Sequence, residues 1–422
     1  MASISHPVLQ PVSSSDRVHY IDVLRGFALY GVLLANLIWF VCDIVLTPVA
    51  AAQLPTHAMD RIVKYLVVFF IDGKFITLFA FLFAVGFTIQ MQRALQSGRN
   101  GLAIYARRVT VLLVIGAVHI VFIWFGDILF VYSLLGFGLL LVRKWRPGIS
   151  VLVVACLLIL LPRVTFISVQ QVRPHDRPAQ IAASHPEETQ QQQTLAAFRG
   201  SYASVIRRNV AIYWGDLFVG GLILVMLPQV FGRFLLGLYV GKRGYIYHVA
   251  EYTPLLRRAL PWLLLVACAG NGASVAQEWA QHTLRLPPTT TWMVALRPVM
   301  EAGVVCLSAC YAVWIALLLQ SQSWAPVVAR LAPVGRMALT NYLAHSLCYL
   351  FFLTGAGLGM LGHFGATVCL ALSILIFGAQ VVFSRWWLRH YRFGPAEWLW
   401  RSLTYGQSQP MRLTAQTSAE RT

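Results

Sequence analysis

The sequence predicts an all-α protein, a polytopic bundle whose helices cross a membrane about ten times. Hydrophobic residues make up 58% of the chain and charged residues only 11%, whereas a soluble domain has about 25% charged residues. Apolar runs of roughly 20 residues recur along the chain, and at a rise of about 1.5 Å per residue each can span the roughly 30 Å hydrocarbon core of a bilayer. A water-soluble fold is therefore excluded.

The expected spans follow one another with short connections. They lie near residues 20–42, 66–91, 109–125, 127–142, 149–168, 216–241, 259–276, 292–319, 332–354 and 364–386. Asp72, Gly73 and Lys74 interrupt the second run, which predicts an interfacial helix followed by a span that begins near Lys74. The sixth run contains Pro228, which predicts a kink because proline removes a backbone hydrogen bond.

Lys and Arg side chains orient these spans. They gather in every second connection, between spans two and three, four and five, six and seven, and eight and nine, and again after span ten. Because loops rich in Lys and Arg stay on the cytoplasmic side, both termini are expected in the cytoplasm. These loops account for the formal net charge of +18, so no nucleic-acid partner is expected.

A long polar segment divides the spans into two groups of five. The predicted parts are an N-terminal half (1–168), an extracytoplasmic flexible loop (169–208), a C-terminal half (209–405) and a disordered cytoplasmic tail (406–422). The loop is rich in Gln, Ala and Ser and poor in bulky apolar residues, as is typical of segments that cannot build a core.

Motifs for metals and common cofactors are lacking in the sequence. The seven cysteines lie in or beside apolar runs without a CxxC pair, and no HExxH, Walker A or GxSxG pattern occurs. Such patterns place metal ligands, phosphate-binding amides or a nucleophile. We therefore expect no metal and no bound cofactor.

Asp22 and Arg25 lie three residues apart and share a helix face at the cytoplasmic end of the first span. Two interpretations remain open. Arg25 can pair with Asp22 and extend to the headgroups, or it can bind a phosphate or carboxylate through two parallel hydrogen bonds. Asn36 lies about three turns deeper on nearly the same face, where an amide can bind a substrate or a neighbouring helix.

Lys74 begins the second span and is a further candidate for substrate binding. Its amine can reach the membrane interface, or it can point into the bundle. In the bundle it requires a partner, and the candidate carboxylates are Asp72, Asp127 and Glu301.

His119 and Asp127 form the most specific catalytic candidate in the sequence. They lie about two turns apart on either side of a very short connection between spans three and four. A histidine can act as a general base, and a carboxylate beside it orients the ring and raises its basicity. The alternative is a histidine that hydrogen-bonds a neighbouring helix.

Spans eight and nine carry further polar residues. Arg297 and Glu301 lie four residues apart and could pair on one face. Asn341 and His345 also share a face, and both are candidates for substrate binding.

Several segments together resemble one bacterial family. They include DVLRGFALYGVLLAN, GKFITLFAFLFAVGF, GAVHIVFIWFGDILFVYSLLGF, GRFLLGLYVGKRG, VGRMALTNYLAHSL and RFGPAEWLWRSLTY. The chain resembles the YeiB-like inner-membrane proteins, whose C-terminal part is domain of unknown function 418. The resemblance covers nearly the whole chain and implies a bacterial inner-membrane location, although members often carry Gln at the place of His345.

A wider similarity suggests a reaction. The segment LRGFAL, together with the spacing of eleven residues from Arg25 to Asn36, resembles the first span of the transmembrane acyltransferase superfamily. Acyltransferase-3 proteins have His at the place of Asn36, whereas the lysosomal heparan glucosaminide N-acetyltransferase has Asn there. The resemblance implies transfer of an acyl group from a cytoplasmic donor, and here His119 would have to supply the base.

Three function classes follow from these features. The first is an acyltransferase with acyl-CoA as donor, in which Arg25 holds the donor phosphate, His119 deprotonates a small-molecule, lipid or glycan acceptor, and Asp127 orients His119. The second is a transporter of a small solute or lipid, because buried charges also form proton relays. The third is a non-catalytic scaffold. Membrane lipids are expected partners, and a homo-oligomer is an open alternative.

The topology predicts that residue 192 lies outside the cytoplasm. In a cysteine-free background, Gln192→Cys is expected to react with a membrane-impermeant maleimide in intact cells. Lys144→Cys, in a basic connection, is expected to react only after the cells are permeabilised. Protection of position 192 in intact cells would reverse the predicted orientation.

Overall fold

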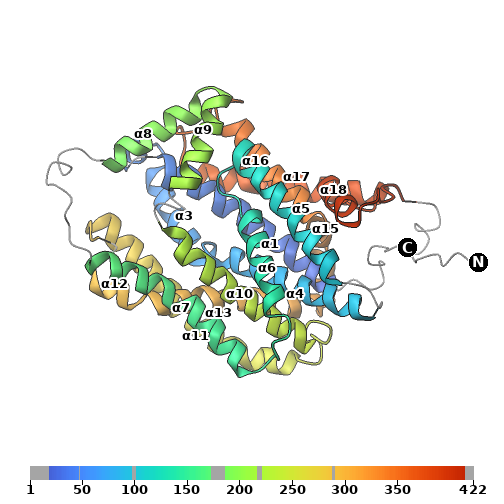
Figure 1. Cartoon of the computed structure of the whole chain (residues 1–422). Helices are drawn as coiled ribbons and strands as arrows, with labels where there is room; N and C mark the ends of the chain where they lie inside the picture. The colour runs from blue at the N-terminus through green and yellow to red at the C-terminus, as the bar shows by residue number, and fades with distance from the viewer. Residues whose placement is uncertain are drawn as a thin grey trace, which may run out of the picture.

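The protein is a helical bundle. The computed structural model describes residues 19–46, 48–96, 101–172, 186–215, 221–287 and 290–413. Within these ranges the elements are helices, and one isolated antiparallel bridge joins Tyr391 to Arg412. Figure 1 shows the long helices packed side by side, with α8 and α9 together at one end of the bundle. The predicted all-α polytopic fold is confirmed.

The helices follow closely along the chain. The first part contains α1 (His19–Ile38), the π-helical η1 (Trp39–Val45), α2 (Pro48–Ala52), α3 (His57–Phe70), α4 (Lys74–Gln96), α5 (Gly101–Phe122), α6 (Leu129–Leu141), α7 (Ile149–Val172), α8 (Pro186–Arg199) and α9 (Tyr202–Ile212). The second part contains α10 (Leu222–Arg243), α11 (Thr253–Thr283), α12 (Thr291–Ala295), α13 (Arg297–Leu319), α14 (Ala325–Val328), the 3₁₀ turn η4 (Ala329–Leu331), α15 (Ala332–Arg336), α16 (Ala338–Leu353), α17 (Ala366–His390) and α18 (Pro395–Tyr405).

Most of the predicted spans are long helices. Among the described residues, eight segments are long and apolar enough to cross a membrane: His19–Val45, His57–Ala94, Gly101–Phe122, Ile149–Phe166, Ile223–Arg243, Thr253–Thr283, Arg297–Leu319 and Ala366–His390. The remaining two predicted spans correspond to the shorter apolar helices α6 and α16. Large apolar side chains such as Leu141, Trp262 and Leu375 lie exposed on the outside of the bundle, as expected for helices that face lipid.

The second span is broken where the sequence predicts. Helix α3 ends at Phe70 and α4 begins at Lys74, and Gly73 between them has φ +78°. This left-handed conformation is open to glycine and strained for other residues. The break leaves carbonyl groups of the last turn of α3 without helical partners, and in a membrane protein such groups must be satisfied internally.

Side chains satisfy the carbonyls at this break. The Lys74 amine donates to the Val68 carbonyl at 2.7 Å, and the Tyr311 hydroxyl of α13 donates to the Phe70 carbonyl at 2.7 Å. The Ser308 hydroxyl, also of α13, donates to the carbonyl of Lys74 at 2.9 Å. Helix α13 therefore holds the break in place.

Helix α4 connects the two predicted halves of the chain. It packs against α1, α5 and α6 from the first half and against α10 and α13 from the second. Helix α1 likewise contacts α15, α16 and α17. Figure 1 shows α7, α10, α11 and α13 grouped on one side of the bundle. The helices of the two halves thus interleave in one bundle.

Part of the expected flexible loop is helical. Residues 169–172 belong to the end of α7, residues 173–185 lie outside the described ranges, and α8 and α9 occupy most of the rest. The buried Phe198 packs against the aromatic rings of Phe40 and Phe125. The prediction of a flexible loop is therefore wrong from residue 186 onward, because tertiary packing stabilises a segment with little apolar character.

The C-terminal segment is ordered further than predicted. The Arg392 amide donates to the Met411 carbonyl at 2.9 Å, so the predicted disorder of 406–422 is wrong as far as residue 413; residues 414–422 lie outside the described ranges. Glu397 of α18 accepts hydrogen bonds from the amides of Leu339 and Thr340 and thereby caps α16. Burial raises the pKa of this carboxyl, and the same hydrogen bonds oppose the shift.

Helices α11 and α13 approach closely at a pair of glycines. A Cβ placed on Gly270 would lie 2.7 Å from the Cα of Gly303, closer than real Cβ contacts. The neighbouring Asn271 amide donates to the Gly303 carbonyl at 3.0 Å. This close crossing uses small residues, as helix pairs in membranes commonly do.

This crossing predicts a difference between two glycines of the same helix. Gly270→Ala is expected to lower the free energy of unfolding by about 1–3 kcal/mol, because the added methyl group overpacks the crossing. Gly272→Ala is the matched control, since a Cβ there meets open space and alanine favours the helix. Thermal unfolding of the purified proteins in detergent measures both. Equal losses for the two variants would contradict this account of the crossing.

Candidate functional site

His119 and Asp127 contact each other directly. The His119 Nδ1 lies 2.7 Å from the Asp127 Oδ2, and both side chains are buried, 1% and 0% exposed. Helix α5 ends three residues after His119, and the chain turns back at Gly126 before α6 begins. The predicted proximity of the two residues is therefore present without a bridging group.

The second oxygen of Asp127 fixes the carboxylate in place. Its Oδ1 accepts a hydrogen bond from the Phe130 amide at 2.7 Å, in the first turn of α6. A Cβ at Gly116 of α5 would lie 2.5 Å from the Phe130 nitrogen and 3.0 Å from this Oδ1. Gly116 thus allows α5 to approach the start of α6 closely enough for the His119 contact.

The imidazole has one nitrogen bound and one unbound. With Nδ1 donating to Asp127, a neutral His119 carries its lone pair on Nε2. Among the described residues, Nε2 is buried and has no hydrogen-bond partner. The ring lies 5.5 Å from that of Tyr342, whose hydroxyl accepts from the Ile128 amide at 3.1 Å. A carboxylate-oriented imidazole with an unoccupied nitrogen is the arrangement of a general base.

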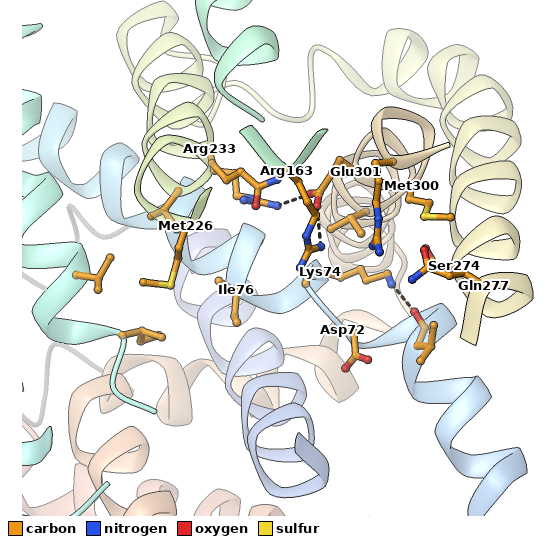
Figure 2. Close-up of a pocket in the computed structure, with 18 of the residues that line it drawn as sticks. Asp72, Lys74, Ile76, Arg163, Met226, Arg233, Ser274, Gln277, Met300 and Glu301 are labelled. Atoms are coloured by element: carbon orange, nitrogen blue, oxygen red, sulfur yellow. Dashed lines mark hydrogen bonds and ion pairs between the residues drawn. The ribbon is translucent and has the colours of Figure 1, made fainter. Parts of the chain in front are cut away.

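A charged cavity of about 480 Å³ lies beside this pair, and Asp127 is part of its wall. It opens where the α3–α4 break, the start of α6, and helices α7, α10, α11 and α13 meet. Its polar and charged lining residues are Asp72, Lys74, Asp127, Arg163, Gln229, Arg233, Ser274, Gln277, Glu278, Arg297 and Glu301. We refer to this space as the charged cavity, and Figure 2 shows it in close-up.

Glu301 is held between two arginines in the wall of the charged cavity. Its Oε1 lies 3.2 Å from Arg163 of α7 and its Oε2 lies 3.1 Å from Arg233 of α10, contacts drawn as dashed lines in Figure 2. The Arg233 Nε also donates to the Thr77 hydroxyl at 2.8 Å. The predicted pair of Glu301 with Arg297 is therefore wrong, because arginines from other helices reach the carboxylate first.

Lys74 points into the bundle and is only 1% exposed. Its hydrogen-bond acceptor is the Val68 carbonyl, so the expectation of a direct carboxylate partner is wrong. The end of α3 supplies this acceptor, because a carbonyl in the last helical turn has no helical donor. The three expected partners, Asp72, Asp127 and Glu301, nevertheless line the same cavity as Lys74.

Arg25 lies elsewhere in the bundle. It forms an ion pair with Asp22 at 3.5 Å, and its side chain is 31% exposed. Its Nη2 lies 3.5 Å from the position of a Cβ on Gly86 of α4, which is twelve residues, or about 18 Å of helix, beyond Lys74. Asn36 is buried, and neither Arg25 nor Asn36 lines the charged cavity.

Asn341 and His345 lie together in a seam between α16 and α17. The Asn341 amide donates to the Ser384 hydroxyl at 3.0 Å, and the His345 Nε2 lies 2.8 Å from the Gln380 Oε1. The Gln380 amide in turn donates to the Asn341 carbonyl at 3.1 Å. These contacts join the two helices, and neither residue lines the charged cavity.

Sequence reasoning missed Arg163 and Arg233 as cavity residues. Each is a charged residue within a predicted span, and that position alone is a signal of function. The described residues contain no group of three or more His, Cys, Asp or Glu side chains arranged to hold a metal ion.

The fold and site together define a multi-pass helical membrane protein with a buried His–Asp pair beside a charged cavity. The chain belongs to the DUF418 family and is YeiB-like. The family described as "Protein of unknown function (DUF418)" matches residues 240–407. The chain is 30% identical to the uncharacterized protein YxaH of Bacillus subtilis over 416 residues, which cover 96% of this chain and 98% of YxaH.

Other relatives extend over the same length. The chain is 29% identical over 417 residues to the uncharacterized protein YeiB of Escherichia coli, covering 92% of this chain and 97% of YeiB. It is 28% identical over 411 residues to an uncharacterized 39.9 kDa protein from the amylase 3′ region of Bacillus acidopullulyticus, covering 96% of this chain and 99% of that protein. No solved structure matches the chain.

Proposed function

We propose that this protein is an acyltransferase of the bacterial inner membrane, with both termini in the cytoplasm, that moves an acyl group from acyl-CoA to an acceptor in the envelope. The observation that carries the proposal is the 2.7 Å contact of His119 with Asp127, which leaves the imidazole Nε2 without a hydrogen-bond partner in the part of the chain that the structure describes. The resemblance of the first span to membrane acyltransferases, through Arg25 and Asn36, supports the same reaction. The exposed apolar helix faces support membrane lipids as partners.

The chemistry assigns one step to each residue of the pair. His119 Nε2 accepts the proton of the acceptor hydroxyl or amine, and the resulting nucleophile attacks the thioester carbonyl of the donor. The carbon–sulfur bond then breaks, and the CoA thiolate leaves with the proton that His119 returns. Asp127 holds the ring in the required tautomer and stabilises the imidazolium that forms between these steps.

Arg25 is the proposed contact for the donor phosphates. Arginine suits this role because its planar guanidinium binds phosphate oxygens through two parallel hydrogen bonds. Arg25 and the charged cavity lie about 18 Å apart along α4. The donor would therefore enter from the Arg25 end and extend its acyl thioester along the bundle toward His119.

A transporter of a small solute or lipid is the second candidate. The observation that favours it is the break at Gly73, which places the start of α4 beside a cavity lined by buried charges. Discontinuous spans with charged or polar sites near mid-membrane are typical of secondary transporters. Transport would use the cavity without requiring chemistry at His119.

The proposed roles of His119 and Asp127 predict a specific pattern of activity losses. In membranes that contain the protein, transfer of radiolabel from acetyl-CoA or palmitoyl-CoA to the envelope fraction is the measurement. His119→Ala and Asp127→Asn are each expected to reduce the rate about a hundredfold or more. The double variant is expected to lose little beyond either single variant, because residues that act as a unit are not additive.

A second histidine–carboxylate pair supplies the matched control. His248 lies 2.9 Å from Glu251 on the surface, so His248→Ala removes a similar contact and is expected to retain full activity. A stably folded His119→Ala protein with full transfer activity would end the acyltransferase proposal and place transport first.

The donor site predicts a difference between arginine and lysine. Arg25→Lys is expected to raise the KM for acyl-CoA about tenfold, because an ammonium group cannot reproduce two parallel hydrogen bonds to phosphate. Arg146→Lys, in an exposed connection, is the control and is expected to leave the KM unchanged. If Arg25→Lys matches the wild-type protein, Arg25 acts as an ion-pair partner of Asp22 and not as a donor contact.

A further inference from the structure

Four basic and four acidic side chains line the charged cavity. The basic side chains come from the start of α4, from α7, from α10 and from the start of α13: Lys74, Arg163, Arg233 and Arg297. An internal cavity in a membrane bundle is costly to fill with like charges unless a counter-charge is present. The balance of the nearby carboxylates therefore decides what the cavity can bind.

Two of the four lining carboxylates are already committed to other groups. The carboxylates are Asp72, Asp127, Glu278 and Glu301. Glu278 pairs with Lys64 at 3.1 Å, and Asp127 directs its two oxygens to His119 and to the Phe130 amide. Asp72 and Glu301 are left to pair with the four basic groups, so the basic side chains outnumber the carboxylates that have no partner outside the cavity.

Three helices begin at the cavity and add positive partial charge to its wall. Lys74 is the first residue of α4, Ile128 directly precedes α6, and Arg297 is the first residue of α13, and all three line the cavity. The amino-terminal end of a helix carries roughly half a positive charge, and at α6 the Asp127 carboxylate already caps this end through the Phe130 amide. Such ends bind phosphate and carboxylate groups in many proteins.

Arg297 has unused hydrogen-bonding capacity in this wall. Its Nε is buried and has no hydrogen-bond acceptor among the described residues. The neighbouring guanidinium groups already bind one carboxylate. Arg163 and Arg233 lie 3.2 and 3.1 Å from the two oxygens of Glu301. Figure 2 shows these two arginines converging on Glu301, with Lys74 and Asp72 beside them.

We propose that the charged cavity is a binding site for a ligand with a phosphate or carboxylate group. Lys74 and Arg297 bind the anion, Arg163 and Arg233 strengthen the site, and Glu301 is an internal carboxylate that competes for the same guanidinium groups. The volume of about 480 Å³ suits a small molecule or a headgroup, since ligand pockets usually measure about 300–1,000 Å³. Ser274 and Gln277 of α11 offer neutral hydrogen-bonding groups to the rest of the ligand. The site does not depend on acyl transfer and serves equally an enzyme or a transporter.

Titration of the purified full-length protein in detergent tests the site. Inorganic phosphate is the probe for a free anion, measured by isothermal titration calorimetry. Phosphatidic acid in phosphatidylcholine nanodiscs is the probe for a lipid headgroup, measured as a rise in Tm over phosphatidylcholine alone. Binding of the first probe identifies a soluble ligand, and a response to the second alone identifies a lipid.

Two substitutions in the same wall are expected to act in opposite directions. Arg297→Gln weakens binding of the responding probe about tenfold or more, because a charged hydrogen-bond donor is lost. Glu301→Gln tightens binding, because it frees the arginines from their internal carboxylate. Arg146→Gln, in an exposed connection, is the matched control and leaves the affinity unchanged.

The opposite effects of Arg297→Gln and Glu301→Gln on affinity distinguish a binding site from a structural ion-pair network. If Glu301→Gln fails to fold, Asp72→Asn replaces it with the same expected direction, because it also removes a negative charge from the wall. The proposal is overturned if the wild-type protein responds to neither probe. It is equally overturned if Arg297→Gln binds as tightly as Arg146→Gln, or if removing a carboxylate weakens binding.

Discussion

The break between α3 and α4 is the constraint on which the site depends. A helix interrupted inside a membrane bundle leaves backbone carbonyls that water cannot reach, so side chains must satisfy them. Lys74 and Tyr311 bind the carbonyls of α3, and Ser308 binds the first carbonyl of α4. Because two of these three side chains come from α13, the break also fixes α13 against α4. That contact brings Glu301 into the cavity wall.

The same break helps to explain why carboxylates can be buried here. Starting α4 within the bundle places a positive helix end, together with Lys74 and Arg233, in the same wall as the carboxylates of Asp72 and Glu301. Isolated ions in a low-dielectric interior are strongly unfavourable, whereas a network with several partners is tolerated. A purely structural role for this network leaves unexplained why the buried Nε of Arg297 has no hydrogen-bond acceptor among the described residues.

The sequence predicted contacts that are local and missed those that are not. His119 and Asp127 are eight residues apart across a short turn. The turn alone keeps the two side chains near each other, however the helices pack. Glu301 bonds Arg163, 138 residues away, and only the packing of α7 against α13 chooses that partner over Arg297. The helices α8 and α9 were missed for a similar reason. Their sequence is polar, and their stability comes from contacts such as Arg199 Nε with the Leu361 carbonyl at 2.9 Å.

Asp127 joins the two candidate sites, and this determines how its variants must be read. One oxygen holds His119, the other caps α6, and the residue also forms part of the cavity wall. Replacing it by alanine therefore removes a helix cap, which by itself costs about 0.5–2 kcal/mol of stability, together with any catalytic orientation, whereas asparagine keeps an oxygen that can cap α6. His119 carries no capping bond, and its Nε2 contacts no polar group of the described chain. A loss of function at His119 without loss of stability is consequently the cleaner evidence for chemistry, and a loss at Asp127 becomes evidence for chemistry only after its effect on α6 has been subtracted.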